Sequence, residues 1–163
     1  MIADSGNRRE FETGAVRDIA DGKGRCDLLP LLEVASLFND HVLPMISDFM
    51  QTGKTEFLKK AIQFFCVESR KDLYTTLLEV SKHFEEGCKK YGERNWEKGI
   101  PLHCYMDSAI RHYFKFLRGD TDERHDRAFV WNILCAMWTL HNIPNCIDLE
   151  FNLTEDEDNE TKM

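Results

Sequence analysis

The chain has 163 residues, of which 42% are hydrophobic and 31% are charged, so it is long enough for one compact domain with a real core. Its formal net charge is -8 at pH 7, which argues against a general nucleic-acid binder, because phosphate backbones need a basic face. No apolar run is long enough to span a bilayer and the N-terminus lacks a signal-peptide core, so a cytoplasmic protein without a membrane partner is expected.

Residues 1–26 are polar and rich in glycine, and they predict an extended arm rather than a helix. Arg17, Lys23 and Arg25 lie close together in this arm. Glycine lets backbone amides approach an anion, so the segment is a candidate for phosphate binding. The alternative is an arm that binds no ligand.

Hydrophobic residues recur at helical spacing along the rest of the chain. The expected helices cover residues 28–38, 42–50, 55–65, 71–91, 105–117 and 120–140. Between residues 128 and 140 the last helix is apolar almost all round, which is typical of a helix at the centre of a bundle. No segment has the pattern of a strand hairpin. The sequence therefore predicts an all-α bundle of about five or six helices, with an N-terminal arm and an acidic C-terminal tail.

The long helix carries a polar stripe. Glu79, His83, Glu86 and Lys90 follow one another at steps of four, three and four residues, with Glu85 beside them. One interpretation is a solvated face with Glu–Lys pairs. The other is a set of inward carboxylates that bind Mg²⁺ or Mn²⁺, ions that prefer oxygen ligands and bridge to substrate phosphates. Spacing alone leaves both interpretations open.

The next two helices carry polar residues in apolar surroundings. Asp107 and Arg111 are four residues apart, and His112 follows directly. The planar guanidinium of Arg111 suits phosphate oxygens, but a buried Asp–Arg pair can equally be structural. On the last helix, His125 and Asn132 share a face. Because a buried amide must be hydrogen-bonded, Asn132 either fixes helix register or contacts a ligand.

The loop of residues 93–98 combines cations with an aromatic ring. Trp96 offers a plane on which a base can stack, while Arg94 or Lys98 meets a phosphate. The alternative is that Trp96 anchors the loop to the hydrophobic core. The sequence alone favours neither.

Four blocks of the sequence resemble one protein family. They read TGAVRD...GKGRCDLLP, HFEEGCKKYGERNWEKGIP, DSAIRHYFKFLRGDTDE and H...WNILCAMW. The chain thereby resembles the dATP/dGTP diphosphohydrolases of bacteriophage and bacterial genomes, which are akin to the all-α MazG-like nucleoside triphosphate pyrophosphohydrolases. The resemblance covers about residues 13–38 and 77–140, and residues 39–76 look like an insertion. The expected organisation is an arm at 1–26, a helical domain at 27–146 and a tail at 147–163.

The resemblance implies metal-dependent hydrolysis of dATP or dGTP to the monophosphate and pyrophosphate, with Mg²⁺, Mn²⁺ or Co²⁺. It also implies a homo-oligomer in the cytoplasm. If a phage encodes the protein, this is the cytoplasm of the host cell. Carried over by position, Glu86 and Glu85 are the expected catalytic residues, and Glu79, Glu86 and Asp107 the expected metal ligands. The residues expected to bind the nucleotide or its phosphates are Arg17, Lys23, Arg25, Lys89, Lys90, Arg94, Asn95, Trp96, Lys98, Arg111, His112, His125 and Asn132.

The chain departs from the MazG-like pattern at the carboxylates. That pattern has Glu-Glu-x-x-Glu followed by Glu-x-x-Asp, whereas here the first motif ends in Lys89. The nearby Glu-x-x-Asp, Glu123 to Asp126, stands at the start of a helix. The metal site is therefore either built differently or missing. In the second case the chain would be a non-catalytic protein that binds and sequesters a nucleotide.

Overall fold

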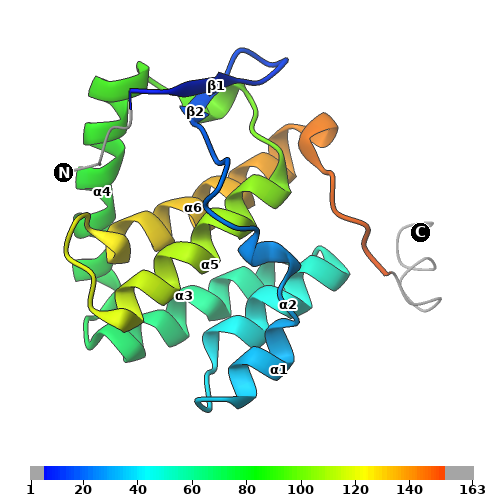
Figure 1. Ribbon diagram of the computed structural model, residues 1–163, viewed down its shortest axis with the longest axis vertical. Coiled ribbons are helices and arrows are strands. Elements are labelled where there is room, and N and C mark those ends of the chain that lie inside the picture. Colours follow the sequence, from blue (N-terminus) through cyan, green and yellow to red (C-terminus); the bar gives the residue numbers. More distant parts are fainter. Residues whose placement is uncertain (1–5, 153–163) are drawn as a thin grey trace.

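The architecture is an all-α bundle, as the sequence predicts (Figure 1). The computed structural model describes residues 6–152. Its α-helices are α1 Leu31–Ser36, α2 Val42–Thr52, α3 Thr55–Ser69, α4 Leu73–Tyr91, α5 Leu102–Arg118 and α6 His125–Asn142. Short 3₁₀ helices are η1 Cys26–Leu28, η2 Asn95–Lys98 and η3 Pro144–Cys146. None of the helices in residues 6–152 combines the length and hydrophobicity that a membrane span requires.

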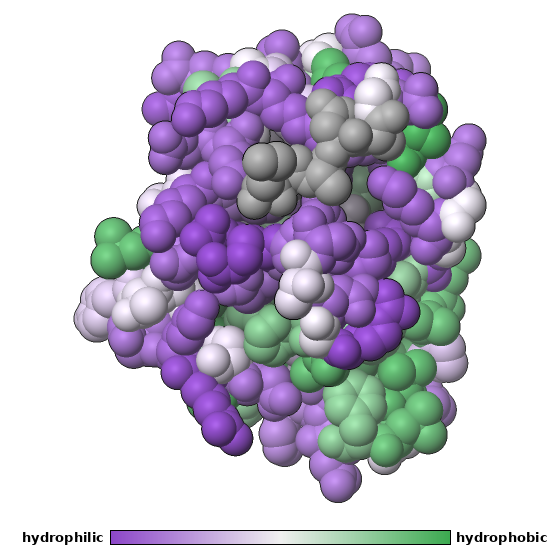
Figure 2. All heavy atoms as spheres, turned by 60° about the vertical axis from the view of Figure 1, so that its left-hand side comes forward, coloured by the Kyte–Doolittle hydropathy of each residue, from purple (hydrophilic) through white to green (hydrophobic). Residues whose placement is uncertain are grey.

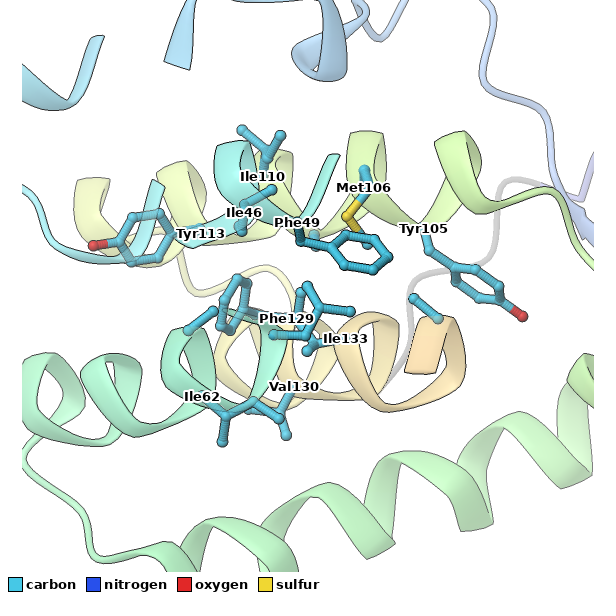
Figure 3. Packing of buried hydrophobic residues seen from close by; sticks show 14 of the residues in the cluster. Ile46, Phe49, Ile62, Tyr105, Met106, Ile110, Tyr113, Phe129, Val130 and Ile133 are labelled. Carbon is cyan, nitrogen blue, oxygen red and sulfur yellow. The ribbon is translucent and has the colours of Figure 1, made fainter. Parts of the chain in front are cut away.

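Helices α2, α3, α5 and α6 enclose one hydrophobic core. Side chains from three of them meet in Figure 3, where Phe49 of α2 and Met106 of α5 lie near Phe129 and Ile133 of α6. Phe65 of α3 completes this layer, with its ring centroid 4.5 Å from that of Phe129. Each fully buried side chain of this size stabilises the fold by roughly 1.5–3 kcal/mol relative to exposure. The core therefore fixes the helices that carry the candidate site.

Helix α6 is central, which confirms what its apolar sequence indicates. It packs against α5, α4 and α3. Successive residues Ala128, Phe129 and Val130 are all buried, although they point in different directions around the helix. A helix with neighbours on several sides needs apolar residues on all of those sides.

Helix α4 buries only part of the apolar stripe formed by Leu77, Phe84, Cys88 and Tyr91, because Phe84 alone of these four packs against the hydrophobic core. Leu77 and Cys88 are exposed, whereas Thr76 and Val80 are buried. The hydroxyl of Thr76 donates to the Asp72 carbonyl at 2.9 Å, so this polar group is satisfied inside the helix. In Figure 2, which turns the side carrying α4 forward, hydrophilic side chains cover most of the face and hydrophobic ones gather low on it. Periodicity located the helix, but packing on α6 decided which stripe is buried.

The first residues of the expected C-terminal tail lie against α2. The ring of Phe151 covers Gly53, where an added Cβ would come within 2.7 Å of the ring. Gly53 also has φ of 72°, a left-handed conformation that ends α2. The amide of Asn152 donates to the Gln51 carbonyl at 2.6 Å. Residues 153–163, which hold the acidic stretch TEDEDNETKM, lie outside the described residues, and the proposed domain boundaries stay a prediction.

The N-terminal arm contains a short antiparallel hairpin, which corrects the expectation that no hairpin is present. Its strands are β1 Arg8–Glu10 and β2 Val16–Asp18. Strands of three residues are too short to show an alternating pattern. Asn95 of η2 stabilises the second strand, because its side chain accepts from the Val16 amide and donates to the Val16 carbonyl, both at 2.8 Å. The arm is thus attached to the loop before α5.

Asn95→Ala should release the arm. Both hydrogen bonds to Val16 would be lost, which destabilises the attachment of the arm by about 1–3 kcal/mol. The equilibrium constant for local opening of the hairpin would therefore rise roughly tenfold or more. Hydrogen exchange should therefore accelerate across β1 and β2 while the amides of α6 stay protected. Asn142→Ala, at the exposed end of α6, is the control. Unchanged exchange in the hairpin would show that other contacts hold the arm.

Candidate functional site

A cavity of about 470 Å³ lies between the N-terminal arm and helices α4, α5 and α6. This volume is within the range of about 300–1,000 Å³ that is typical of small-molecule sites. Arg17 and Lys23 line it from the arm, while Arg111 and His112 of α5 and Asn132 of α6 line it from the bundle. The cavity therefore brings together predicted site residues from three separate parts of the chain.

The wall of this cavity is strongly basic. Its cationic side chains are Arg9, Arg17, Lys23, Arg111, Lys115 and Arg118. Its carboxylates are Asp18 and Glu123. Because the whole chain carries a net charge of -8, this local excess of positive charge indicates a site for an anion.

Three guanidinium nitrogens in this wall are buried and have no hydrogen-bond partner within residues 6–152: Arg9 Nε, Arg17 Nη1 and Arg111 Nε. The same groups are held in place through their other nitrogens. Arg17 Nη2, for example, donates to Ser108 at 3.1 Å and to Asn132 at 3.3 Å. An unsatisfied buried donor destabilises a fold by about 1–3 kcal/mol, so these nitrogens point to a ligand that is rich in acceptor oxygens.

The arm reaches the cavity because a buried ion pair anchors it. Asp107 accepts from Arg111 Nη2 at 2.7 Å and also from the Cys26 amide at 2.7 Å. Arg111 Nη2 in turn lies 2.7 Å from the Gly24 carbonyl. Asp107 lines a second cavity instead, together with Arg25, which pairs with Asp27. Asp107 thus acts here as an anchor for the arm.

Trp131 of α6 is the largest aromatic side chain in the cavity wall. The guanidinium of Arg17 lies 5.8 Å from its ring centroid, and the ring of His83 lies 5.7 Å from it. Trp131 was not among the predicted site residues, because a tryptophan in an apolar helix is normally part of the core. Its position beside Asn132 in the block WNILCAMW was the available signal.

Trp96, the aromatic residue that the sequence suggested for base stacking, lies outside the cavity wall. Its ring packs edge-on against Phe84 at 5.7 Å and Trp138 at 5.0 Å. These contacts match the alternative interpretation, in which Trp96 anchors the loop. Its role toward a nucleotide stays a prediction.

A chain of polar contacts lies at the junction of α5 and α6. Nδ1 of His112 lies 2.9 Å from Nδ1 of His125, and Nε2 of His125 lies 2.7 Å from Asp122. Burial and the neighbouring His125 hold the pKa of His112 well below its usual value. Two groups in the described residues bring possible metal ligands together: His112 with Glu123 and His125, and His125 with Asp120 and Asp122.

The carboxylates expected on α4 do not form such a group. Glu79 accepts from Arg127 at 2.5 Å, a contact that lowers the pKa of Glu79 to about 2. Glu85 is exposed and pairs with Lys89 at 3.4 Å. Glu86 belongs to neither cluster of possible ligands found in residues 6–152. The assignment of a metal ion to α4 therefore stays a prediction.

The remaining predicted cations lie outside the cavity wall. Lys90 pairs with Asp18 at 3.0 Å, and Arg94 pairs with Glu97 at 2.6 Å. Lys98 lies beside the turn of the hairpin at Gly14. Asn95, by contrast, lines the cavity, and its side chain also accepts the hydrogen bond from Val16 that holds β2.

Lys115 and Arg118 line the cavity, although they were not among the predicted site residues. They follow Arg111 at steps of four and three residues, so the three cations share one face of α5. That spacing was a usable signal in the sequence. Arg9 gave no such signal, because it reaches the cavity only through the fold of the hairpin.

A sequence model of the family described as dATP/dGTP diphosphohydrolase, N-terminal, matches residues 67–148. No curated protein and no solved structure matches the chain. The matched range contains α4, α5 and α6, and with them the bundle side of the cavity. The arm that supplies Arg9, Arg17 and Lys23 precedes it.

The free energy of unfolding should decrease as the pH falls from about 7 to about 5, because His83 resists protonation in the folded protein. Burial is the main cause that lowers its pKa to about 4, whereas the unfolded chain has a value near 6.5. Between these values the unfolded state binds more protons, so stability decreases with falling pH, by up to about 1.4 kcal/mol per unit. In urea unfolding, His83→Gln should reduce the difference between the two pH values by roughly 1–2 kcal/mol.

His141→Gln, on the exposed end of α6, is the matched control and should leave that difference unchanged. An identical pH dependence in His83→Gln and the parent protein would contradict a depressed pKa of His83.

Proposed function

The chain belongs to the dATP/dGTP diphosphohydrolase family, and from this premise we propose that its basic cavity binds a purine deoxynucleoside triphosphate. The proposed reaction is metal-dependent hydrolysis between the α- and β-phosphates, which yields the monophosphate and pyrophosphate. One observation carries the proposal: Arg9, Arg17 and Arg111, each of which has a buried donor without a partner in residues 6–152, all line one cavity. A polyphosphate would supply acceptor oxygens for all three.

The basic face of α5 suits a polyphosphate in particular. Arg111, Lys115 and Arg118 extend over two turns of the helix, or about 10 Å along its axis. Arg17 and Lys23 face them from the arm across the cavity. Hydrogen bonds between such cations and phosphate oxygens contribute about 1.5–3 kcal/mol each.

Aromatic rings in the cavity wall suit a base. Trp131 and His83, with ring centroids 5.7 Å apart, supply ring surface, and Phe114 also lines the cavity. Flat rings favour a purine because its area of stacking is large. The amide oxygen of Asn132 already accepts from Arg17, and its amide nitrogen donates to Ala128 at 2.8 Å. Asn132 therefore acts on the nucleotide by positioning Arg17.

A divalent ion would neutralise part of the triphosphate charge and lower the pKa of a bound water. His112 and Glu123 in the cavity wall offer donor atoms of the kinds that such ions bind. The cations of the wall would meanwhile hold the phosphates and stabilise charge that develops on them.

The second candidate function is a nucleotide binder without turnover. It is favoured by one observation, namely that Glu79, Glu85 and Glu86 do not assemble in the described residues. Such a protein would keep the basic cavity and its affinity for triphosphates. Measured turnover separates the two candidates.

Product analysis by ion-exchange chromatography tests the proposal. The purified chain is incubated with each deoxynucleoside triphosphate and Mg²⁺, Mn²⁺ or Co²⁺. We expect a monophosphate and pyrophosphate from dATP or dGTP. Intact nucleotide that stays bound to the protein would instead support the binder, and the absence of any thermal shift with nucleotides would contradict both candidates.

Lys115→Met should weaken nucleotide binding by roughly tenfold to a hundredfold, because one charge-assisted contact contributes about 1.5–3 kcal/mol. Methionine keeps most of the aliphatic stem and removes the charge. Lys89→Met on α4 is the matched variant, since Lys89 is exposed and lies outside the cavity wall. Isothermal titration with dGTP should show weakening for Lys115→Met alone. The opposite pattern would move the phosphate site to α4.

A further inference from the structure

The junction of α5 and α6 holds a compact set of side chains that resembles a metal centre. His112 comes from α5, His125 is the first residue of α6, and Glu123 lies in the loop that connects them. Each offers one ligand atom, and these atoms lie within 4.8 Å of one another. His125 is only 2% exposed, so the fold holds at least one member rigidly.

The hydrogen bonds of His125 orient it as a ligand. Its Nε2 faces the Asp122 carboxylate at 2.7 Å, so the proton of a neutral His125 lies on Nε2. The lone pair is then on Nδ1, which faces Nδ1 of His112 at 2.9 Å. A carboxylate that accepts from the outer nitrogen of an imidazole is the usual support of a metal-bound histidine.

Both imidazoles can reach one ion. Imidazole nitrogens bind ions such as zinc at about 2.0–2.1 Å, so two nitrogens 2.9 Å apart are close enough to share one. The competing explanation is a single hydrogen bond between the two rings, in which one Nδ1 carries the proton. The geometry that favours an ion is the third ligand atom, a carboxylate oxygen of Glu123 that lies within 4.8 Å of the ligand atoms of both histidines.

The cluster also opens into the basic cavity. His112 and Glu123 line the cavity together with Lys23 and Lys115. An ion at this point would therefore lie beside the proposed polyphosphate site. Among residues 6–152, the cavity wall contains one other carboxylate, Asp18, whose oxygens accept from Lys90 at 3.0 Å and from Tyr91 at 3.0 Å.

We propose that His112, Glu123 and His125 hold a divalent transition-metal ion, with Asp122 as the positioning residue behind His125. Two imidazoles and one carboxylate suit Mn²⁺, Co²⁺ or Zn²⁺ better than Mg²⁺, which prefers oxygen ligands and water. This assignment deepens the proposed function, on which its biological role rests, by placing the ion at the junction of α5 and α6 instead of on α4.

Cobalt binding tests the proposal without nucleotide or turnover. The full chain is stripped with a chelator and titrated with Co²⁺, and the visible absorption of the bound ion is recorded. We expect one Co²⁺ per chain and a far weaker response to competing Mg²⁺ than to competing Zn²⁺. Glu123→Gln should weaken binding by about tenfold or more, and Asp122→Asn by roughly tenfold to a hundredfold.

Controls separate the ligands from the fold. Circular dichroism should show an intact fold in Glu123→Gln, which replaces a partly exposed carboxylate and leaves both buried rings in place. His141→Ala, on the exposed end of α6, should bind Co²⁺ as the parent does. Loss of Co²⁺ binding in Glu86→Gln with full binding in Glu123→Gln would overturn the assignment in favour of α4.

The result is also distinguishable from failure of the proposed function. Binding of dGTP to the stripped protein is followed separately through tryptophan fluorescence. Nucleotide binding without any Co²⁺ binding would overturn the metal centre alone. Tight Co²⁺ binding that depends on Glu123, without any nucleotide binding, would uphold the metal centre and contradict the nucleotide site.

Discussion

The buried pair of Asp107 and Arg111 on α5 holds the N-terminal arm against the helical bundle, and the cavity depends on that attachment. Asp107 accepts from the Cys26 amide, while Arg111 donates to the Gly24 carbonyl. Both side chains are largely shielded from water, so removing either partner would destabilise the fold by about 3–5 kcal/mol. The Asn95 contacts to Val16 hold the strand that carries Arg17, and the Asp107–Arg111 pair holds the segment that follows it.

Placing several cations in one wall of an acidic protein works against folding. The pKa of Lys23 is lowered, chiefly by burial; the carboxylates of Asp18 and Glu123 oppose this shift, while the charges of Arg111 and Lys115 add to it. The unpartnered donors of the three arginines add a further penalty. Repelling charges and unsatisfied buried donors are expected at functional sites, because a bound ligand supplies the missing interactions there. The proposed triphosphate would relieve both the repulsion and the unsatisfied donors.

Most of the helices, and part of the cavity wall, were predictable from sequence. The steps of three and four residues located α3, α4 and α6, and the same spacing placed Arg111 and His112 on a helix that lines the cavity. The carboxylate stripe of α4 shows where this reasoning stops. Periodicity states which side chains share a face, but the neighbour of that face depends on how the helices pack. In α4 the outcome for Glu79 is an ion pair with Arg127.

The sequence by itself determined the all-α class, the family and the local order along each helix, because these follow from backbone geometry and from residues that are near one another in the chain. Only the tertiary structure decided that Arg9 and Arg17 line the same cavity as the basic face of α5. It also decided that Nδ1 of His112 contacts Nδ1 of His125 across the loop between α5 and α6. These pairings join residues whose separation is set by core packing and by the Asn95 and Asp107 contacts to the arm. No repeat along the chain encodes such distances, since they arise only when the helices pack together.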